Sequence, residues 1–175
     1  GSILIEAFIL SNSVLTENMN IYNRTRTKAQ TIKDQYPNIT ICNSEVELAQ
    51  NSDLLFVCVK PGEMHHVLKT IAKHLSTEKC VVSITSPISV TQLEFTLPCQ
   101  TARLIPSITN KVLTGVSLIT FGENCSEQWR EKIRQLASNI SEAIEIDNTI
   151  TRVSSDIVSC GPAFFSYLAQ QFING

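Results

Sequence analysis

Short apolar runs alternate with amphipathic stretches along most of the chain. Runs rich in valine and isoleucine are typical of buried strands, whereas apolar residues three and four positions apart are typical of helices. The expected strands cover residues 19–22, 39–42, 54–59, 81–84, 102–105, 116–121 and 143–146. The expected helices cover residues 3–10, 27–36, 44–50, 61–75 and 126–140. This alternation predicts an α/β protein with a doubly wound, mostly parallel sheet and helices on both faces.

Two serines are placed to cap helices of this pattern. Ser44 stands three residues before Glu47, the spacing of a capping box, and Ser126 precedes the helical stretch that carries Trp129.

Both ends of the chain depart from the alternation. A doubly wound nucleotide fold opens with a strand that feeds a glycine turn, but here an apolar helical pattern directly follows Gly1. We therefore expect the first strand to be missing, two neighbouring strands to lack a ladder partner, and the chain to be an excerpt of a longer protein. The expected parts are a Rossmann-like domain over residues 1–150 and the start of a second, helical part over residues 151–175.

Composition narrows the classes of partner. The net charge is −2, with 43% hydrophobic and 17% charged residues, so no basic excess points to nucleic acid. No apolar run approaches the ~18 residues that span a bilayer, and the first residues lack a signal-peptide pattern. We expect a cytoplasmic protein without a membrane partner. The six cysteines form no C-x-x-C pair, and adjacent histidines such as His65 and His66 seldom bind one ion, so no metal site is expected.

Residues 23–26 are candidates for binding the ribose end of a dinucleotide. The residue after the second strand of such a fold selects between a ribose hydroxyl and a 2′-phosphate. This chain has Asn23, Arg24, Thr25 and Arg26 there, with no Asp or Glu, and an arginine fork suits a phosphate. The pattern favours NADP(H). An ordinary solvated start of a helix would have the same residues.

Polar residues also follow the next two strands. Val59, Lys60 and Pro61 would lie at the carboxyl edge of the sheet, where open α/β folds bind ligands. A plain strand end explains Lys60 equally well. Ser83 and Ser86 are small enough to approach a nicotinamide ring or a small substrate, but such residues are also common in turns.

A possible anion site lies near the end of the chain. Ser159, Cys160 and Gly161 precede Pro162, and a helix starting at this proline would direct backbone N–H groups toward a substrate carboxylate. A plain helix start remains the alternative. Cys160 has no histidine or other base nearby in the sequence, so a nucleophilic role is not expected.

Taken together, five segments resemble conserved segments of the pyrroline-5-carboxylate reductase family across nearly the whole chain. Residues 1–7 are similar to the last glycine of its G-x-G-x-x-G turn and the helix that follows. The other four segments are 57–61, 82–84, 103–106 and 159–164, similar to V-x-V-K-P, V-S-I-A-A-G, R-x-M-P-N-T-P and S-G-S-G-P-A-Y.

This resemblance implies hydride transfer from NADPH to the C=N bond of a small cyclic imino acid, as in proline biosynthesis. It implies that residues 1–150 are an NADP-binding domain and that residues 151–175 begin an all-helical dimerisation domain, through which a homodimer forms. It also implies no catalytic acid or base, and further substrate contacts from beyond residue 175, so that this stretch alone is inactive. The implied cofactor-binding residues are Gly1, Asn23, Arg24, Thr25, Arg26, Val59, Lys60, Pro61 and Ser83. The implied substrate-binding residues are Ser86, Pro106, Ser159, Cys160 and Gly161.

Two segments depart from the family pattern. Thr85, Ser86 and Pro87 replace Ala-Ala-Gly, and the proline ring would reshape the nicotinamide pocket. Residues 106–109 are Pro-Ser-Ile-Thr in place of Pro-Asn-Thr-Pro. These changes are most similar to a late-competence branch of the family. The alternative function is therefore an NADP(H)-binding regulatory paralogue linked to competence and sporulation.

Overall fold

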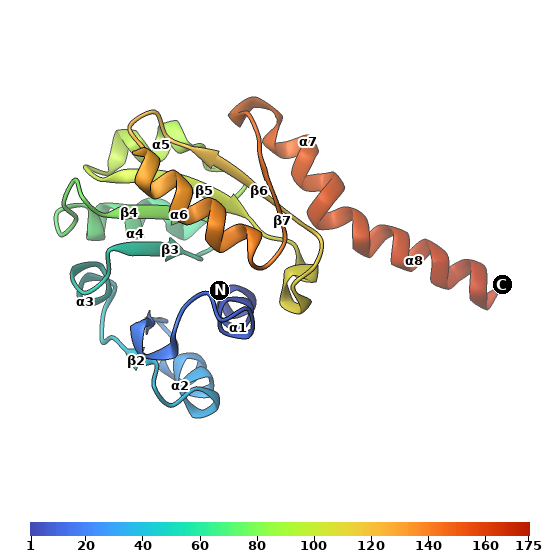
Figure 1. The fold of residues 1–175 in the computed structure, drawn as a ribbon, viewed down its shortest axis with the longest axis horizontal. Helices are drawn as coiled ribbons and strands as arrows, with labels where there is room; N and C mark the ends of the chain where they lie inside the picture. Colours follow the sequence, from blue (N-terminus) through green and yellow to red (C-terminus); the bar gives the residue numbers. More distant parts are fainter.

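The strands form two groups in the computed structural model, which describes residues 1–175. One group is the parallel pair β1–β2, and the other is a five-stranded sheet of order β3-β4-β5-β6-β7, in which only β5 and β6 are antiparallel (Figure 1). The strands are β1 (Asn20–Ile21), β2 (Thr40–Ile41), β3 (Leu54–Val57), β4 (Cys80–Ser83), β5 (Gln100–Ile105), β6 (Val116–Phe121) and β7 (Glu142–Glu145). The prediction of a mostly parallel α/β sheet is confirmed, and all seven expected strands are present with ends shifted by one or two residues.

Helices connect the strands as expected. The main helices before the last strand are α1 (Ser2–Leu10), α2 (Arg26–Gln35), α3 (Glu45–Gln50), α4 (Pro61–Ala72), α5 (Val90–Thr96) and α6 (Glu127–Ser138). Ser44 and Ser126 accept the backbone N–H of Glu47 and Trp129, so both predicted caps are confirmed. Helix α5 was not predicted, although Ser89 and the glutamine three residues later form a full capping box at its start.

Apolar side chains are buried in two clusters, one on each face of the five-stranded sheet. Helices α1 and α6 contribute Phe8 and Ile133 to the first cluster, and α3, α4 and α5 pack into the second. Every residue of β4 is buried, with Val82 in the first cluster and Val81 in the second. This burial on both faces explains why the strand is a continuous apolar run without alternation.

The hydrogen-bonded ladder is interrupted between β1 and β3. The two groups of strands share no strand pairing, as expected from the sequence, and α1 packs with both groups through the first apolar cluster. Backbone groups on the facing edges of β1 and β3 therefore have no ladder partner.

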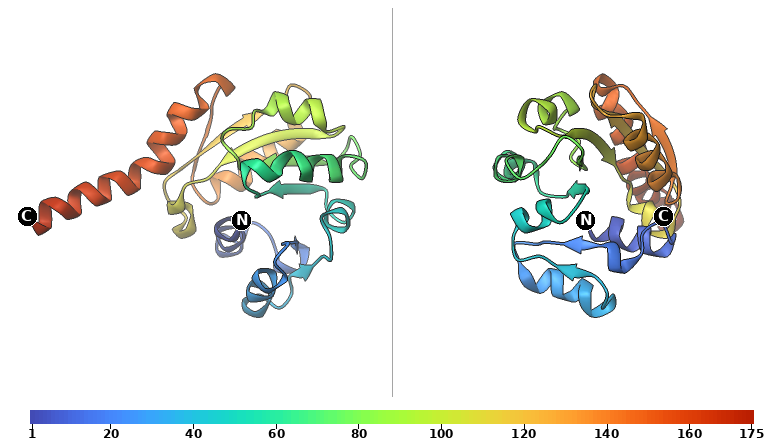
Figure 2. Two further views of the ribbon diagram at one scale, coloured as in Figure 1. Left: turned by 180° about the vertical axis from the view of Figure 1, so that it is seen from behind. Right: turned by 60° about the vertical axis from the view of Figure 1, so that its left-hand side comes forward.

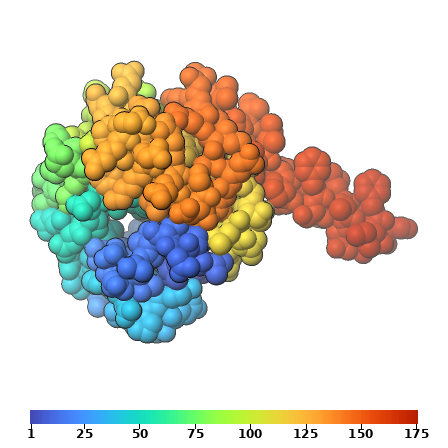
Figure 3. Space-filling model, in the orientation of Figure 1, coloured from blue at the N-terminus to red at the C-terminus, as the bar shows by residue number.

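The last part of the chain is one long helical arm. It consists of α7 (Thr151–Ser155), a wide π-type turn η4 (Asp156–Cys160) and α8 (Gly161–Asn174), and it projects from the body of the molecule (Figures 1, 2 and 3). The exposed apolar side chains of α8 are Phe164, Phe165, Tyr167, Leu168, Phe172 and Ile173. None of the helices has both the length and the apolar character needed to cross a bilayer.

Helix α8 begins at Gly161 with Pro162 in its first turn, as predicted, but it is not a free helix start. The chain is already helical from Thr151, and the Gly161 N–H donates to the Asp156 carbonyl within the wide turn. Proline lacks an N–H and its ring crowds the carbonyl four residues earlier, so a wide turn before Pro162 lets the helix continue. The N–H groups expected to face an anion are therefore inside a helix.

Candidate cofactor site

The carboxyl ends of the parallel strands bring several sequence-predicted residues to one edge. The Thr85 hydroxyl, after β4, donates to the Val59 carbonyl, after β3, over 3.3 Å. Gly1 lies against the residue after β3 so closely that an added Cβ would be 3.4 Å from the Cys58 Cβ. A row of loops thus runs along the edge where open α/β folds bind their ligands.

Residues 23–25 lie in the loop between β1 and α2, Arg26 is the first residue of α2, and all four are exposed. The Asn23 side-chain oxygen accepts the Thr25 N–H at 2.9 Å, which fixes the turn. The Arg24 guanidinium lies 2.6 Å from a Glu63 carboxylate oxygen, and Arg26 donates to the Asn43 side chain at 3.1 Å. The predicted phosphate-binding residues therefore form one exposed basic group of side chains.

Tyr22 lies just before this group and is half-buried. Burial raises the pKa of its hydroxyl, and the nearby Glu45 carboxylate raises it further, so Tyr22 stays neutral at physiological pH. It adds no negative charge beside Arg24.

Lys60 and Pro61 lie where the fold turns from β3 into α4. The strand ends at Val57, two residues earlier than predicted, and Lys60 is the N-cap of α4 with Pro61 in the first turn. Proline is favoured there because the missing N–H has no helical partner. Lys60 is exposed at the edge of the site, and its contact with a cofactor stays a prediction.

Ser83 and Ser86 differ in accessibility. Ser83 is fully buried, and its hydroxyl accepts the Thr85 N–H at 3.1 Å. Its side chain therefore supports the turn from inside and does not face a ligand, which corrects the expectation from the sequence. Ser86 is half-buried, and its carbonyl accepts a hydrogen bond from the Arg103 guanidinium at 3.3 Å.

Arg103 is a buried arginine that bonds to several segments of the chain. The sequence pattern did not single it out as a functional residue. Only 2% of its surface is exposed, and burial lowers the pKa of its guanidinium. Arg103 donates hydrogen bonds to five oxygens, all of them neutral, and its Nε has no hydrogen-bond partner. The acceptors are the carbonyls of Ser86 and Ile88, the hydroxyls of Thr120 and Thr151, and the Asn148 side-chain oxygen. Arg103 thereby connects the turn after β4 to β6 and to the start of the helical arm.

Residues 106–109, the second segment that differs from the family pattern, begin a closed turn after β5. The buried Asn110 accepts the Ser107 N–H at 2.7 Å and donates to the Thr114 carbonyl at 3.0 Å. Gly115 has a φ of +79°, and a Cβ there would collide with the Thr109 hydroxyl. This turn is held by its own side chains.

The structure brings Pro106 and Ser159 together. The Ser159 hydroxyl donates to the Pro106 carbonyl at 3.4 Å, although 53 residues separate them in sequence. Cys160 is exposed on the arm, whereas Gly161 is buried. Of the three arm residues expected to bind substrate, Ser159 is the one bonded to the strand-end loops.

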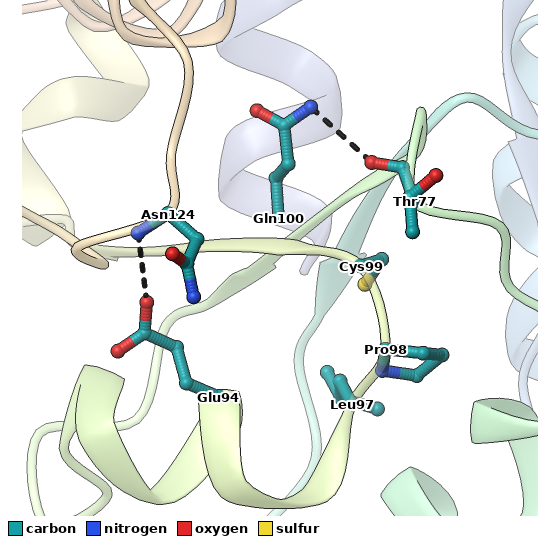
Figure 4. A pocket seen from close by; sticks show the side chains of 7 residues that line it. All are labelled: Thr77, Glu94, Leu97, Pro98, Cys99, Gln100 and Asn124. Atoms are coloured by element: carbon teal, nitrogen blue, oxygen red, sulfur yellow. Dashed lines mark hydrogen bonds between the residues drawn. The ribbon is translucent and has the colours of Figure 1, made fainter.

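A cavity of about 310 Å³ lies at the opposite edge of the sheet, near the amino ends of β4 and β5 (Figure 4). Its lining includes Glu94, which accepts the Asn124 N–H, and Gln100, which donates to the Thr77 carbonyl. None of the sequence-predicted site residues lines it, and open α/β folds bind their ligands at the other edge.

Comparison with known proteins finds similar chains over nearly the whole length of this one. A family described as "NADP oxidoreductase coenzyme F420-dependent" matches residues 1–87. The chain is 48% identical over 174 residues to ComE operon protein 4 of Bacillus subtilis (strain 168), covering 99% of this chain. It is 24% identical over 178 residues to the pyrroline-5-carboxylate reductase of Corynebacterium melassecola, covering 99% of this chain and 65% of that protein. The chain is thus similar over nearly its whole length to pyrroline-5-carboxylate reductases. The resemblance inferred from its sequence segments is thereby confirmed.

Solved structures of this family share the fold. The pyrroline carboxylate reductase of Plasmodium falciparum, solved with NADP bound, matches with a TM-score of 0.88 at 20% identity, over 99% of this chain and 64% of that one. The chain likewise spans 64% of the length of the Bacillus protein. Its activity, substrate and partners as a whole protein are therefore taken up as proposals.

Proposed function

We propose that the whole protein is an NADP(H)-dependent oxidoreductase of the pyrroline-5-carboxylate reductase type. The observation that carries this proposal is the exposed group of residues 23–26, which offers two arginines and no carboxylate of its own at the carboxyl end of β1. A dinucleotide with a 2′-phosphate fits this group better than one with a free ribose hydroxyl. The similarity to a pyrroline carboxylate reductase solved with NADP bound supports the same cofactor.

The residues present fit NADP(H) along the whole edge. Arg24 has the planar fork that binds a phosphate with two parallel hydrogen bonds, and its neighbours Asn23, Thr25 and Arg26 add further donors. Gly1, without a side chain, leaves room for a close approach beside Cys58. Val59, Lys60 and Pro61 would flank the nicotinamide end.

The proposed reaction is reduction of the C=N bond of a small cyclic imino acid. NADPH, when bound, supplies the hydride. The chain's contribution is to position and bind the substrate: Ser86, Pro106 and Ser159 would contact the small acid where it meets the cofactor. Rate would come from alignment and local electrostatics, without a covalent intermediate.

We also propose how the parts of the chain divide this work. Residues 1–150 form the cofactor domain, and residues 151–175 begin a helical dimerisation domain, because α8 exposes six large apolar side chains. The protein acts as a cytoplasmic homodimer in proline biosynthesis under this proposal.

A second candidate function rests on the two departures from the family pattern. Arg103 fixes the turn that contains Ser86 and Pro87, and Asn110 closes the turn after β5, so both segments are rigid alternatives to the family's loops. A chain 48% identical to ComE operon protein 4 that binds NADP(H) without turning over an imino acid would be a regulatory paralogue linked to competence.

One assay separates the two functions. The whole protein is mixed with NADPH and pyrroline-5-carboxylate, and the absorbance of the reduced nicotinamide is followed, with NADH and substrate-free mixtures as controls. Steady NADPH oxidation supports the reductase. NADPH binding without oxidation contradicts it, and activity gained by the triple change Thr85→Ala, Ser86→Ala and Pro87→Gly would then support the regulatory paralogue.

A further inference from the structure

Glu63 places a carboxylate directly on the arginine proposed to bind the cofactor phosphate. It lies in the first turn of α4, after β3, whereas Arg24 follows β1, so the contact joins the two groups of strands across 39 positions of sequence. The Glu63 Oε1 to Arg24 Nη1 distance is 2.6 Å, and the side chains are 41% and 83% exposed. Exposed ion pairs contribute little stability, so Arg24 can exchange this partner for another oxyanion.

The other members of the group are engaged differently. Asn23 and Thr25 bond to each other, and Arg26 donates to the neutral side chain of Asn43. Asn43 is itself held by Glu47, which accepts both its backbone and its side-chain N–H. Within residues 23–26, Arg24 is therefore the one whose structural partner is an anion.

We propose that Glu63 is a specificity-determining residue for the cofactor. Its carboxylate competes with the 2′-phosphate for Arg24 and so narrows the preference for NADPH over NADH. This inference rests on the proposed function, because it takes Arg24 as the phosphate-binding residue.

Electrostatics gives the direction of the effect. A bound 2′-phosphate would lie within a few ångströms of Glu63, and two anions at that separation repel each other even through water. NADH carries a ribose hydroxyl at the same place. A carboxylate accepts a hydrogen bond from such a hydroxyl, so NADH binding would not be penalised.

Glu63 also has an ordinary structural role. An acidic residue in the first turn of a helix interacts favourably with the helix dipole. That role alone predicts a small loss of stability on replacement and equal effects on both cofactors. The ratio of the two affinities therefore separates the roles.

The test is titration of the whole protein with NADPH and NADH, followed by reduced-nicotinamide fluorescence. Glu63→Gln should tighten NADPH binding about three- to tenfold and change NADH binding less than about twofold. The matched control is Glu78→Gln, an exposed acid next to the amino end of β4, which removes the same charge far from this edge. It should leave the ratio of the two affinities unchanged.

A second pair of variants tests whether Glu63 acts through Arg24. In an Arg24→Met background the competition for Arg24 is gone and only direct repulsion of the phosphate remains, so Glu63→Gln should tighten NADPH binding less than it does with Arg24 present. The proposal is overturned if wild type binds NADPH and Glu63→Gln leaves the NADPH/NADH ratio unchanged or lowers it. Wild type that binds neither cofactor would overturn the proposed function as well, so the two failures are distinguishable.

Discussion

Two arginines at the same edge of the sheet have opposite environments. Arg24 is 83% exposed and bonded to one carboxylate, whereas Arg103 is 2% exposed and bonded to five neutral oxygens. An exposed arginine with one anionic partner can exchange that partner for a ligand at little cost. A buried arginine that satisfies oxygens from four segments cannot be removed without leaving those oxygens unpaired.

The contrast divides the site into an adaptable half and a fixed half. The nucleotide half, around Arg24, is built from exposed side chains whose partners are replaceable. The half expected to face the substrate, around Ser86 and Pro106, is held from behind by Arg103 and by the buried Asn110. Substitutions in the nucleotide half should change the affinity for the cofactor, and substitutions in the other half should change the free energy of unfolding.

The largest expected effect is on stability, from Arg103→Met. The change relieves the cost of a buried cation but leaves several acceptors unpaired, so we expect a net loss of about 3 kcal/mol. Urea unfolding of the whole protein measures it. Arg24→Met is the control and should change the unfolding free energy by less than ~0.5 kcal/mol. A loss below about 1 kcal/mol for Arg103→Met would show that the buried hub is not structural.

The hub around Arg103 also shows where sequence reasoning stopped. The strands and most helices could be predicted because their apolar periodicity is local, and α5 could have been found from its capping box. Arg103 itself was visible as a charge within an apolar strand, but its partners Thr120 and Thr151 come from distant segments that no local pattern connects.

The candidate site was likewise predictable where it depends on local sequence patterns, and not where it depends on contacts between distant segments. Residues 23–25 lie in an exposed loop after a strand, as the pattern indicated, and Arg26 begins α2. Helix α8 begins at Gly161 as predicted, but the free N–H groups expected there are absent, because a wide turn before Pro162 lets an existing helix continue into it. Ser83 was expected to face a ligand, but its side chain is buried. Both faces of β4 are buried, so neither side-chain direction at this position leads to the surface. The Glu63 contact spans two separate groups of strands and leaves no signal in the sequence.

The next effect is on cofactor affinity, from Arg24→Met. Hydrogen bonds to a charged group contribute about 1.5–3 kcal/mol, so NADPH binding should weaken about 10- to 100-fold. NADH binding should change little, because its ribose carries no phosphate. Parallel fluorescence titrations measure both constants. Equal weakening of the two cofactors would mean that Arg24 does not distinguish them.

The smallest expected effect is a pH dependence of the folding stability, caused by Asp147, which lies beside the fixed half of the site. Its carboxylate accepts the hydroxyl and the backbone N–H of Thr149, and these bonds hold its pKa below the ordinary value of 3.8. A lowered pKa stabilises the folded state above the ordinary value, and this contribution is lost as pH falls through the folded pKa. Asp147→Ala should therefore lower the unfolding midpoint in urea at about pH 7, and the difference from wild type should narrow below about pH 4. A difference that stays constant across this range would exclude the carboxylate as its source.

The central claim is that residues 23–26 and the loops beside them form an NADP(H) site. Titration of the whole protein with NADPH and with NADH tests it most directly. We expect saturable binding of both cofactors, with NADPH bound more tightly than NADH and this difference lost at high salt, because the extra affinity is electrostatic. NADH binding equal to or tighter than NADPH, or no binding of either, would contradict it.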